Sequence, residues 1–516
     1  MHAVPPVHLV IMQPPGYIHS LGFLDQARHV RYQLRRLGAQ VTLAKNRLRE
    51  DAINIVFGAH LGFDLGWKAR HTCLFFNLEQ LGQNGAKLPP AYLALLRSSA
   101  VIDYDAANVA HYATDTDDVP IVPFGHSPFL NTEPAIALED RPIDLLFFGS
   151  MNERRRAYID RVERSGVSVA TFDTPLYSEE RDRFIRQAKA VLNCSYYETS
   201  RFEQARASHC LSLGTPVISQ QRDAAAPGAA FAESVFWLPD AEVEGFFKRE
   251  FKTPAFFETA RRQLAAFATH DPIEAYADLL AFAIGADQGY RRSRTTDAWQ
   301  PTRINLGSGK DYKACWLNLD VLDRAEPDLV LDLGQAVEWP VQAATRFGGT
   351  VRLEPGTIER VYANNVLEHV PDLPMLMTNV LDLLRDGGVF EIEVPYERAL
   401  TAWQDPTHLR ALNENSWLYY TGWFWYLGWF ETRFDLAQMQ YLDLQLKACT
   451  RENAAFMRVI LKKIPTTLRE QMTARAMQAD FGGVADDLEW LAPEAPAETS
   501  VAQADVRVPS PAEAMA

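Results

Sequence analysis

The first 280 or so residues alternate short apolar runs with stretches of helical periodicity. In the first cycle the apolar runs are HLVIMQ (8–13), AQVTLA (39–44), AINIVFG (52–58), TCLFFNLE (72–79), SAVIDYD (99–105) and VPIVPFG (119–125). Amphipathic stretches such as the one from Leu24 to Leu37 separate them. This alternation is typical of a parallel sheet covered by helices, and it predicts an α/β unit over residues 1–135.

The same alternation starts again at Ile143. It continues through IDLLFFG (143–149), VSVATFD (167–173), a helical stretch around residues 179–190, AVLNCSYYE (190–198) and LGTPVISQ (213–220). The pattern predicts a second Rossmann-like unit over residues 136–284. Residues 285–301 are polar and lack periodicity, which predicts a linker. Two such sheets in sequence would form a cleft between their strand ends, where open α/β sheets bind ligands.

A third α/β unit is predicted over residues 302–465. Its expected strands are INLGSGK (304–310), WLNLDV (316–321), DLVLDLG (328–334), RVYANNVLEHV (360–370) and the end of LLRDGGVFEIEVP (383–395), where a helix end and a DGG turn come first. Residues 482–516 are rich in alanine, proline and acidic side chains, a composition that predicts a disordered tail. The fold class expected for the whole chain is therefore α/β, with three Rossmann-like units.

Length and charge narrow the possible functions. The chain has 516 residues and a net charge of −15, so several domains are expected and broad electrostatic binding to nucleic acid is not. Its five cysteines show no CxxC or Cys/His spacing, which disfavours a disulfide framework or a zinc site. Because neither a signal-like segment nor an apolar run of about 18 residues occurs, we expect a cytoplasmic protein without an integral membrane segment.

A glycine-rich turn follows the first expected strand of the third unit. Gly307 and Gly309 can adopt positive φ and let the backbone approach a ligand closely. Asp320 ends the next strand, where a carboxylate can accept hydrogen bonds from both ribose hydroxyls. Dinucleotides and S-adenosylmethionine both use such a turn, but the dinucleotide version needs a further glycine where this chain has Tyr312. A methyl-donor site is therefore favoured over a nicotinamide site, and an ordinary turn with a solvated aspartate is the alternative.

With the segments that follow, this pattern resembles the class I S-adenosylmethionine-dependent methyltransferases, specifically the small type 11-like group, over about residues 302–447. The resemblance implies cofactor contacts by Asn305, Gly307, Ser308, Gly309, Asp320, Asp332, Asn364 and Asn365. Asp320 would hold the ribose and Asp332 the adenine side.

Two positions depart from that family. Asn305 stands where the family usually has an acid, and an amide cannot offset the sulfonium charge. Only seven residues separate Gly309 from Leu317, too few for a crossover helix between parallel strands. We therefore expect a donor pocket that is more open on that side or covered by something else.

Methyl transfer to a hydroxyl requires a group that takes the hydroxyl proton. His369, which the resemblance directs toward the donor pocket, and His408 are the candidates, because imidazole titrates near neutral pH. Asp405 could orient His408 across a turn, although it is also typical of a helix cap. The aromatic run WLYYTGWFWYLGWF (417–430) would line an acceptor pocket or fill a core. Nothing in the pattern requires a metal ion.

The second unit contains NCSYYETSRFEQARASHCLSLGTPVIS (193–219), which resembles the nucleotide-sugar-binding segment of the GT-B glycosyltransferases. The resemblance implies sugar-nucleotide contacts by Gly149, Ser150, Arg154, Glu198, Glu203, Gly214 and Thr215. The family's paired glutamates fall on Arg201 and His209, so either Glu198 and Glu203, with Arg206, replace them or the transferase activity is altered or lost. His19 is a candidate base on the acceptor side.

These observations predict an S-adenosylmethionine-dependent methyltransferase fused to a GT-B-like glycosyltransferase, acting on a saccharide or glycoconjugate. S-adenosylmethionine is the expected cofactor, and a nucleotide sugar is a possible co-substrate. Two other interpretations stay open. The first unit pair could be an inactive saccharide-binding module, or both clefts could be degenerate and the chain a non-catalytic scaffold.

Overall fold

The computed structural model describes residues 4–82, 85–114, 118–131, 136–197, 201–221, 228–293, 297–313 and 315–477. The tail expected at 482–516 lies outside these residues. The chain divides into two compact units, residues 1–385 with 390–392, and residues 386–389 with 393 onward. The first unit contains two complete sheets and the beginning of a third, and the boundary between the units runs through one strand of that third sheet.

The first sheet is five-stranded and parallel, in the order β2-β1-β3-β4-β5. Its strands are β1 (Val7–Ile11), β2 (Val41–Lys45), β3 (Ile53–Phe57), β4 (Thr72–Asn77) and β5 (Ala100–Asp103), and helices α1 (Leu24–Arg36), α2 (Pro90–Arg97) and α3 (Ala106–Val109) follow their strands. β1 and β3 are buried along their whole length, because helices cover both faces. The predicted first Rossmann-like unit is thus confirmed.

The second sheet is also five-stranded and parallel, in the order β10-β9-β8-β6-β7. Its strands are β6 (Ile143–Leu146), β7 (Val169–Ala170), β8 (Ala188–Asn193), β9 (Val217–Gln220) and β10 (Phe236–Leu238). Its helices are α4 (Glu153–Glu163), α5 (Ser178–Gln187), α6 (Gln204–Ser212), α7 (Ala229–Ala232), α8 (Val243–Arg249) and α9 (Pro254–Thr269). The chain therefore begins with the pair of Rossmann-like units that the sequence predicted.

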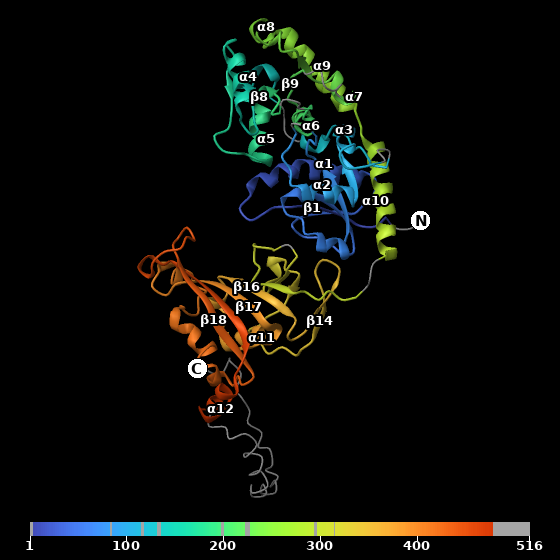
Figure 1. Cartoon of the computed structure of the whole chain (residues 1–516). Coiled ribbons are helices and arrows are strands. Elements are labelled where there is room, and N and C mark those ends of the chain that lie inside the picture. The colour runs from blue at the N-terminus through green and yellow to red at the C-terminus, as the bar shows by residue number, and fades with distance from the viewer. Residues whose placement is uncertain are drawn as a thin grey trace, which may run out of the picture. The chain divides into compact units, whose positions relative to one another are not determined.

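Helix α10 (Ile273–Ser293) returns from the second sheet to the first (Figure 1). Tyr276, Leu279 and Ala283 are buried in the same core cluster as the strands β1 and β3. Asp287 on the same helix accepts a hydrogen bond from Thr72 Oγ1 at 2.6 Å. Residues 285–293, expected in a linker, are thus helical: most of them are exposed, while Asp287 is buried against the first sheet.

The third sheet has seven strands in the order β13-β12-β11-β16-β17-β19-β18. They are β11 (Arg303–Leu306), β12 (Leu317–Asp320), β13 (Leu329–Val330), β16 (Ile358–Asn364), β17 (Leu384–Pro395), β18 (Thr432–Leu442) and β19 (Phe456–Pro465). A separate hairpin joins β14 (Val341–Ala344) to β15 (Thr350–Leu353), and the helices are α11 (Leu373–Leu383) and α12 (Leu468–Met477). Numbered without the hairpin, the strands run 3-2-1-4-5-7-6, with 6 and 7 antiparallel. This is the class I methyltransferase order that the motifs predicted.

Two local predictions were wrong. VPIVPFG (119–125) forms only one isolated bridge, Asp103 to Ile121, because its two prolines lack the donors that a strand needs. The DGG turn at 386–388 is not a separate turn: β17 starts at Leu384, directly after α11, and Gly387 takes a φ of 76° within the strand.

None of the helices in the described ranges has both the length and the apolar character needed to cross a bilayer. All five cysteines are free thiols.

Candidate functional site

The glycine turn lies where β11 ends beside β16. Leu306 pairs in parallel register with Ala363, so Gly307 lies at the level of Asn364. Gly307 has a φ of 62°, and a Cβ added there would come 2.3 Å from Val366 Cγ2. Gly309 also has a positive φ, 45°, but has open space around it. Only glycine can therefore occupy position 307 without moving the loop that follows β16.

Asp320 ends β12 beside this turn. Its Oδ2 accepts a hydrogen bond from Gly309 N and its Oδ1 one from Leu322 N, both at 2.8 Å. The carboxylate is buried, and its two oxygens keep further acceptor positions for hydroxyl donors. Asp332 follows β13, is exposed, and accepts a hydrogen bond from Gly334 N at 2.8 Å.

Two buried polar atoms at these strand ends lack a protein partner. Ser308 Oγ and Asn364 Oδ1 make no hydrogen bond to any residue in the described part of the chain. A buried oxygen without a partner costs about 1–3 kcal/mol, so such atoms are explained by a ligand or water that completes them. Asn365, next in the chain, adopts a left-handed φ of 52°. The oxygen atoms of Ser308, Asn364 and Asp320, together with the glycine turn, fit a small polar ligand such as S-adenosylmethionine.

The segment 310–316 replaces the missing crossover helix with a hydrogen-bonded loop. Asn305 is buried, and its Nδ2 donates to Asp311 O at 2.7 Å and to Asn318 Oδ1 at 2.9 Å. Lys313 N donates to the same Asn318 oxygen, while Tyr312 Oη donates to Asp328. Both N–H bonds of the Asn305 amide therefore hold this loop, and direct contact of Asn305 with the cofactor stays a prediction.

Residues of the first sheet cover this loop. The Arg47 guanidinium stacks 4.5 Å above the Tyr312 ring and 5.4 Å from the Phe347 ring, and it pairs with Glu326 at 2.9 Å. Glu50 N donates a hydrogen bond to Phe347 O at 3.0 Å. Arg47 and Glu50 thus make contacts over the side of the third unit where the crossover helix is missing. No motif identified Arg47, since its role depends on contacts some 265 residues away in sequence.

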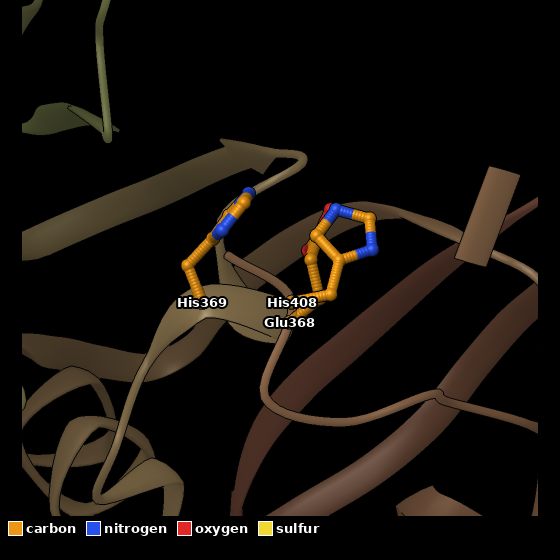
Figure 2. Close-up of side chains that lie close together, drawn as sticks. All are labelled: Glu368, His369 and His408. Atoms are coloured by element: carbon orange, nitrogen blue, oxygen red, sulfur yellow. The ribbon is translucent and has the colours of Figure 1, made fainter. Parts of the chain in front are cut away.

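The two candidate bases lie near one carboxylate. His369 and Glu368 belong to the short 3-10 helix Leu367–His369 after β16, and His408 follows β17. Each of the three offers a ligand atom within 4.8 Å of the others (Figure 2). Glu368 is buried. Imidazole and carboxylate can accept protons or ligate a divalent cation, and the sequence had given no reason to expect a metal.

Asp405 contacts its own turn. Its Oδ1 accepts hydrogen bonds from Thr407 N at 2.8 Å and from Thr407 Oγ1 at 2.7 Å. His408 Nδ1 lies 2.9 Å from Ala402 O. Asp405 thus caps a turn, but it is not the helix cap of the alternative interpretation, because the next helix in the described residues, Glu414–Tyr420, has Asn413 as its N-cap.

The aromatic run 417–430 divides between core and surface. Trp417, Tyr420, Phe424 and Trp429 are buried, whereas Tyr419, Trp423 and Tyr426 are exposed. Tyr419 contacts both Trp423 and Tyr426 edge-on, with ring centroids 5.3 and 5.7 Å apart. The buried residues confirm that part of this run fills a core, and an acceptor pocket lined by the exposed ones stays a prediction.

A second candidate site is the cavity of about 390 Å³ between the first two sheets. His19 and Asp25 line it from the segment after β1, and Arg201 and Arg206 line it from the second sheet. His19 Nδ1 lies 2.8 Å from Tyr177 Oη of the second Rossmann-like unit. Glu79, which the sequence analysis missed, also lines it, and burial raises the pKa of its carboxyl.

Next to this cavity, Gly149 lies close to two guanidinium groups, of which that of Arg206 lines the cavity. A Cβ there would come 2.7 Å from Arg206 Nη2 and 3.2 Å from Arg155 Nη1. Both guanidiniums pair with the single carboxylate of Glu203, so the group keeps a net positive charge. Arg155 is buried and also donates to Ser150 O at 2.9 Å, whereas Arg154 is exposed and does not line the cavity. The sugar-nucleotide contact that the resemblance implies for Arg154 stays a prediction.

The other predicted sugar-nucleotide residues lie elsewhere. Gly214, with a φ of 73°, ends α6, and Thr215 is buried, donating to Ile185 O at 2.8 Å and accepting from Arg141 Nη1 at 2.9 Å. Neither lines the cavity. Glu198 falls outside the described residues.

Arg201 and His209 are both paired with acids. The Arg201 guanidinium pairs with Asp105 of the first sheet at 2.5 Å. His209 Nε2 lies 2.8 Å from Asp182 Oδ1, and burial of Asp182 is outweighed by His209 and Arg181, which hold the pKa of its carboxyl below the usual value. Arg201 is thus paired with an acid of the first Rossmann-like unit, whereas His209 is paired with an acid of its own unit.

Residues 274–443 match the family model described as a methyltransferase domain. No curated protein matches the chain at a significant level.

Solved structures of two kinds are similar in fold. An S-adenosylmethionine-dependent methyltransferase from Archaeoglobus fulgidus is 12% identical, with 35% of this chain and 92% of that one covered and a TM-score of 0.23. The glycosyltransferase AviGT4 of avilamycin A biosynthesis is 16% identical over 54% and 98% of the two chains, with a TM-score of 0.32. WaaG, a glycosyltransferase of lipopolysaccharide biosynthesis, is 13% identical over 54% and 100%, with a TM-score of 0.36.

Proposed function

We propose, on the premise that residues 274–443 form a methyltransferase domain, that this chain methylates a hydroxyl of a saccharide or glycoconjugate with S-adenosylmethionine as donor. We propose further that the two preceding Rossmann-like units act on the same class of molecule as a nucleotide-sugar-dependent transferase.

One observation carries the methyl-donor proposal. Ser308 Oγ and Asn364 Oδ1 are buried without partners beside a turn in which only glycine fits, and the Asp320 carboxylate is next to them. Burial of these two oxygens is costly unless a ligand or a water molecule provides hydrogen bonds to them. A ligand with hydroxyl and amine donors would satisfy them.

The chemistry needs alignment and one proton transfer. S-adenosylmethionine, when bound, supplies an electrophilic methyl carbon on a sulfonium sulfur. The protein's task is to hold the acceptor oxygen in line with that carbon and to exclude water. As the new O–CH₃ bond forms and the S–CH₃ bond breaks, the hydroxyl proton passes to an imidazole, for which His369 and His408 are our candidates.

Isothermal titration calorimetry with S-adenosylmethionine and S-adenosylhomocysteine tests the donor site. We expect binding by the wild type and a loss of at least about tenfold in affinity for Asp320→Ala, since a charged hydrogen-bond acceptor is removed. Asp435→Ala, an exposed acid on β18, is the matched control and should bind like the wild type. Absence of binding by a folded wild-type chain would refute the proposal.

Chelation distinguishes two uses of the histidines. If His369 or His408 takes the proton directly, methyl transfer resists EDTA and falls with each His→Ala change. If they hold a cation with Glu368, EDTA abolishes transfer and Mg²⁺ or Mn²⁺ restores it.

A specific observation favours the second activity. Arg155 and Arg206 share one carboxylate, Glu203, and the surplus positive charge lies beside Gly149 at the start of α4. Such a group suits a diphosphate. We expect UDP-glucose or GDP-mannose to bind, with Arg206→Ala weakening the interaction and the exposed Arg154→Ala leaving it unchanged. If neither nucleotide sugar binds while S-adenosylmethionine does, the pair is a saccharide-binding module.

A further inference from the structure

A cavity of about 620 Å³ lies apart from both candidate sites. One wall is the segment Met12–Gly16 after β1 together with the end of β2, and the other is the loop 310–316 that follows the glycine turn. Both walls belong to the same compact unit of the chain. They come from two different sheets, at the strand ends where α/β folds bind ligands.

The side chain of Asn46 holds the first wall in place. Asn46 ends β2 in a left-handed conformation, with a φ of 54°. Its side-chain amide accepts from Gln13 N and donates to Gln13 O, both at 2.7 Å, so it clamps the segment after β1 from both sides. A left-handed non-glycine residue is uncommon and is maintained only where its surroundings fix it.

The second wall is fixed just as firmly. Asn318 Oδ1 accepts from Lys313 N at 2.8 Å, and Asn318 Nδ2 donates to Lys313 O at 2.9 Å. This two-sided clamp has the same form as that of Asn46 on Gln13. Arg47, next to Asn46 in the chain, then joins the walls through its stacking on Tyr312. The cavity is therefore preorganised from both sides, as a binding site requires.

The lining combines flat apolar surface with positive charge. Pro14, Pro15 and Trp316 offer surfaces against which a sugar ring can pack, and the Gln13 amide is polar. Lys45 and Lys310 are exposed and form no ion pair with a described residue, while Lys313 is paired with Asp311 at 3.0 Å. Two cationic amines thus face the cavity without a counter-charge, in a chain whose overall charge is −15.

We infer that this cavity binds an anionic saccharide, with the sugar ring against Trp316 and the prolines and its phosphate or carboxylate group between Lys45 and Lys310. The inference deepens the proposed function and rests on it, because it names the acceptor class. The segment after β1 connects the two proposed activities: its first residues line this cavity and its later ones, from His19, line the cleft between the first two sheets. An acceptor held here lies next to the loop of the methyl-donor turn.

Saturation-transfer difference NMR on the full chain tests the inference with three probes: glucose 6-phosphate, glucuronic acid and uncharged glucose. We expect signals from one or both anions that exceed those from glucose. Lys45→Ala/Lys310→Ala should weaken the binding of the anions roughly tenfold, since two charged contacts are lost. Lys87→Ala/Lys248→Ala removes two exposed lysines outside this cavity and should bind like the wild type. The relative signals of the two anions distinguish a phosphate from a carboxylate ligand.

Equal binding of glucose and the anions, absence of binding by both anions, or an unchanged affinity in Lys45→Ala/Lys310→Ala would each overturn the inference. Its failure can be told apart from failure of the proposed function by calorimetry with S-adenosylmethionine on the same wild-type sample. Donor binding without anion binding removes only the anionic-acceptor site. Anion binding without donor binding removes the methyl-transfer proposal and leaves the cavity as a saccharide site.

Discussion

At the scale of single residues, Gly307 and Gly309 form a matched pair. Both have positive φ, but a Cβ on Gly307 would collide with Val366 while one on Gly309 meets nothing closer than 3.9 Å. We expect Gly307→Ala to lower the affinity for S-adenosylmethionine at least tenfold and the stability by about 1–3 kcal/mol, and Gly309→Ala to have a smaller effect on both. Val366→Ala should partly rescue the first variant, because it removes the collision. Calorimetry and thermal denaturation measure both effects, and equal losses in the two glycine variants would contradict the steric argument.

His29 gives the fold a specific sensitivity to acid. Burial in the first core lowers the pKa of its imidazole to about 3, and its Nδ1 lies 2.6 Å from Ser127 Oγ. Below pH 6.5 the unfolded chain binds a proton at this position that the folded chain does not, so stability is lost as the pH falls from 6.5 toward 3. The expected slope is about 1.4 kcal/mol per pH unit.

The melting temperature between pH 7.5 and 5 measures this slope. His29→Gln should flatten the decrease, whereas His111→Gln, a surface replacement, should leave it as in the wild type. An identical slope in both variants would show that other groups, such as the buried His8, dominate.

At the scale of elements, the loop 310–316 depends on a residue of another sheet. Removing the Arg47 side chain takes away the stacking on Tyr312 and the ion pair with Glu326. We expect Arg47→Ala to speed hydrogen exchange at the Gly309 and Lys313 amides and to weaken S-adenosylmethionine binding. The control is Arg49→Ala. Arg49 pairs with Asp51 at 2.6 Å, and both residues lie in the connection between β2 and β3. Unchanged exchange in Arg47→Ala would show that the loop is held by its own hydrogen bonds alone.

The elements also show what the sequence could and could not predict. Buried strands such as β1 and β3 were identifiable because their apolar runs are short, continuous and bounded by turn residues. The glycine turn was identifiable because positive φ demands glycine. The contacts of Arg47 with Tyr312 and the ion pairs of Arg201 and His209 could not be predicted, because they depend on long-range contacts that leave no local periodicity.

At the scale of the whole molecule, a buried ion group joins the first two sheets. Arg181 on α5 pairs with Asp25 on α1 at 2.8 Å and with Asp182 at 2.7 Å, and all three side chains are almost fully buried. Burial opposes the charge on Arg181, but the two carboxylates raise the pKa of its guanidinium. We expect Arg181→Ala to cost about 3–5 kcal/mol, since it leaves Asp25 buried without its arginine and Asp182 with only His209 as a partner.

Chemical denaturation followed by tryptophan fluorescence measures that loss. Arg183→Ala, an exposed position on the same helix, should change stability by less than about 0.5 kcal/mol. A loss of similar size in both variants would indicate that the helix, rather than the ion group, is affected.

The return of α10 to the first sheet determines which parts can move. The chain crosses between the two sheets twice, once between β5 and β6 and once between α9 and α10. Closure of the cleft over the proposed sugar nucleotide would therefore need two hinges, and the second sheet would move as one lobe. The chain leaves for the third sheet from α10, which is packed on the stationary lobe. Binding of the sugar nucleotide would thus leave the segment after β1 in place. An acceptor bound at that segment would keep its position between sugar transfer and methyl transfer.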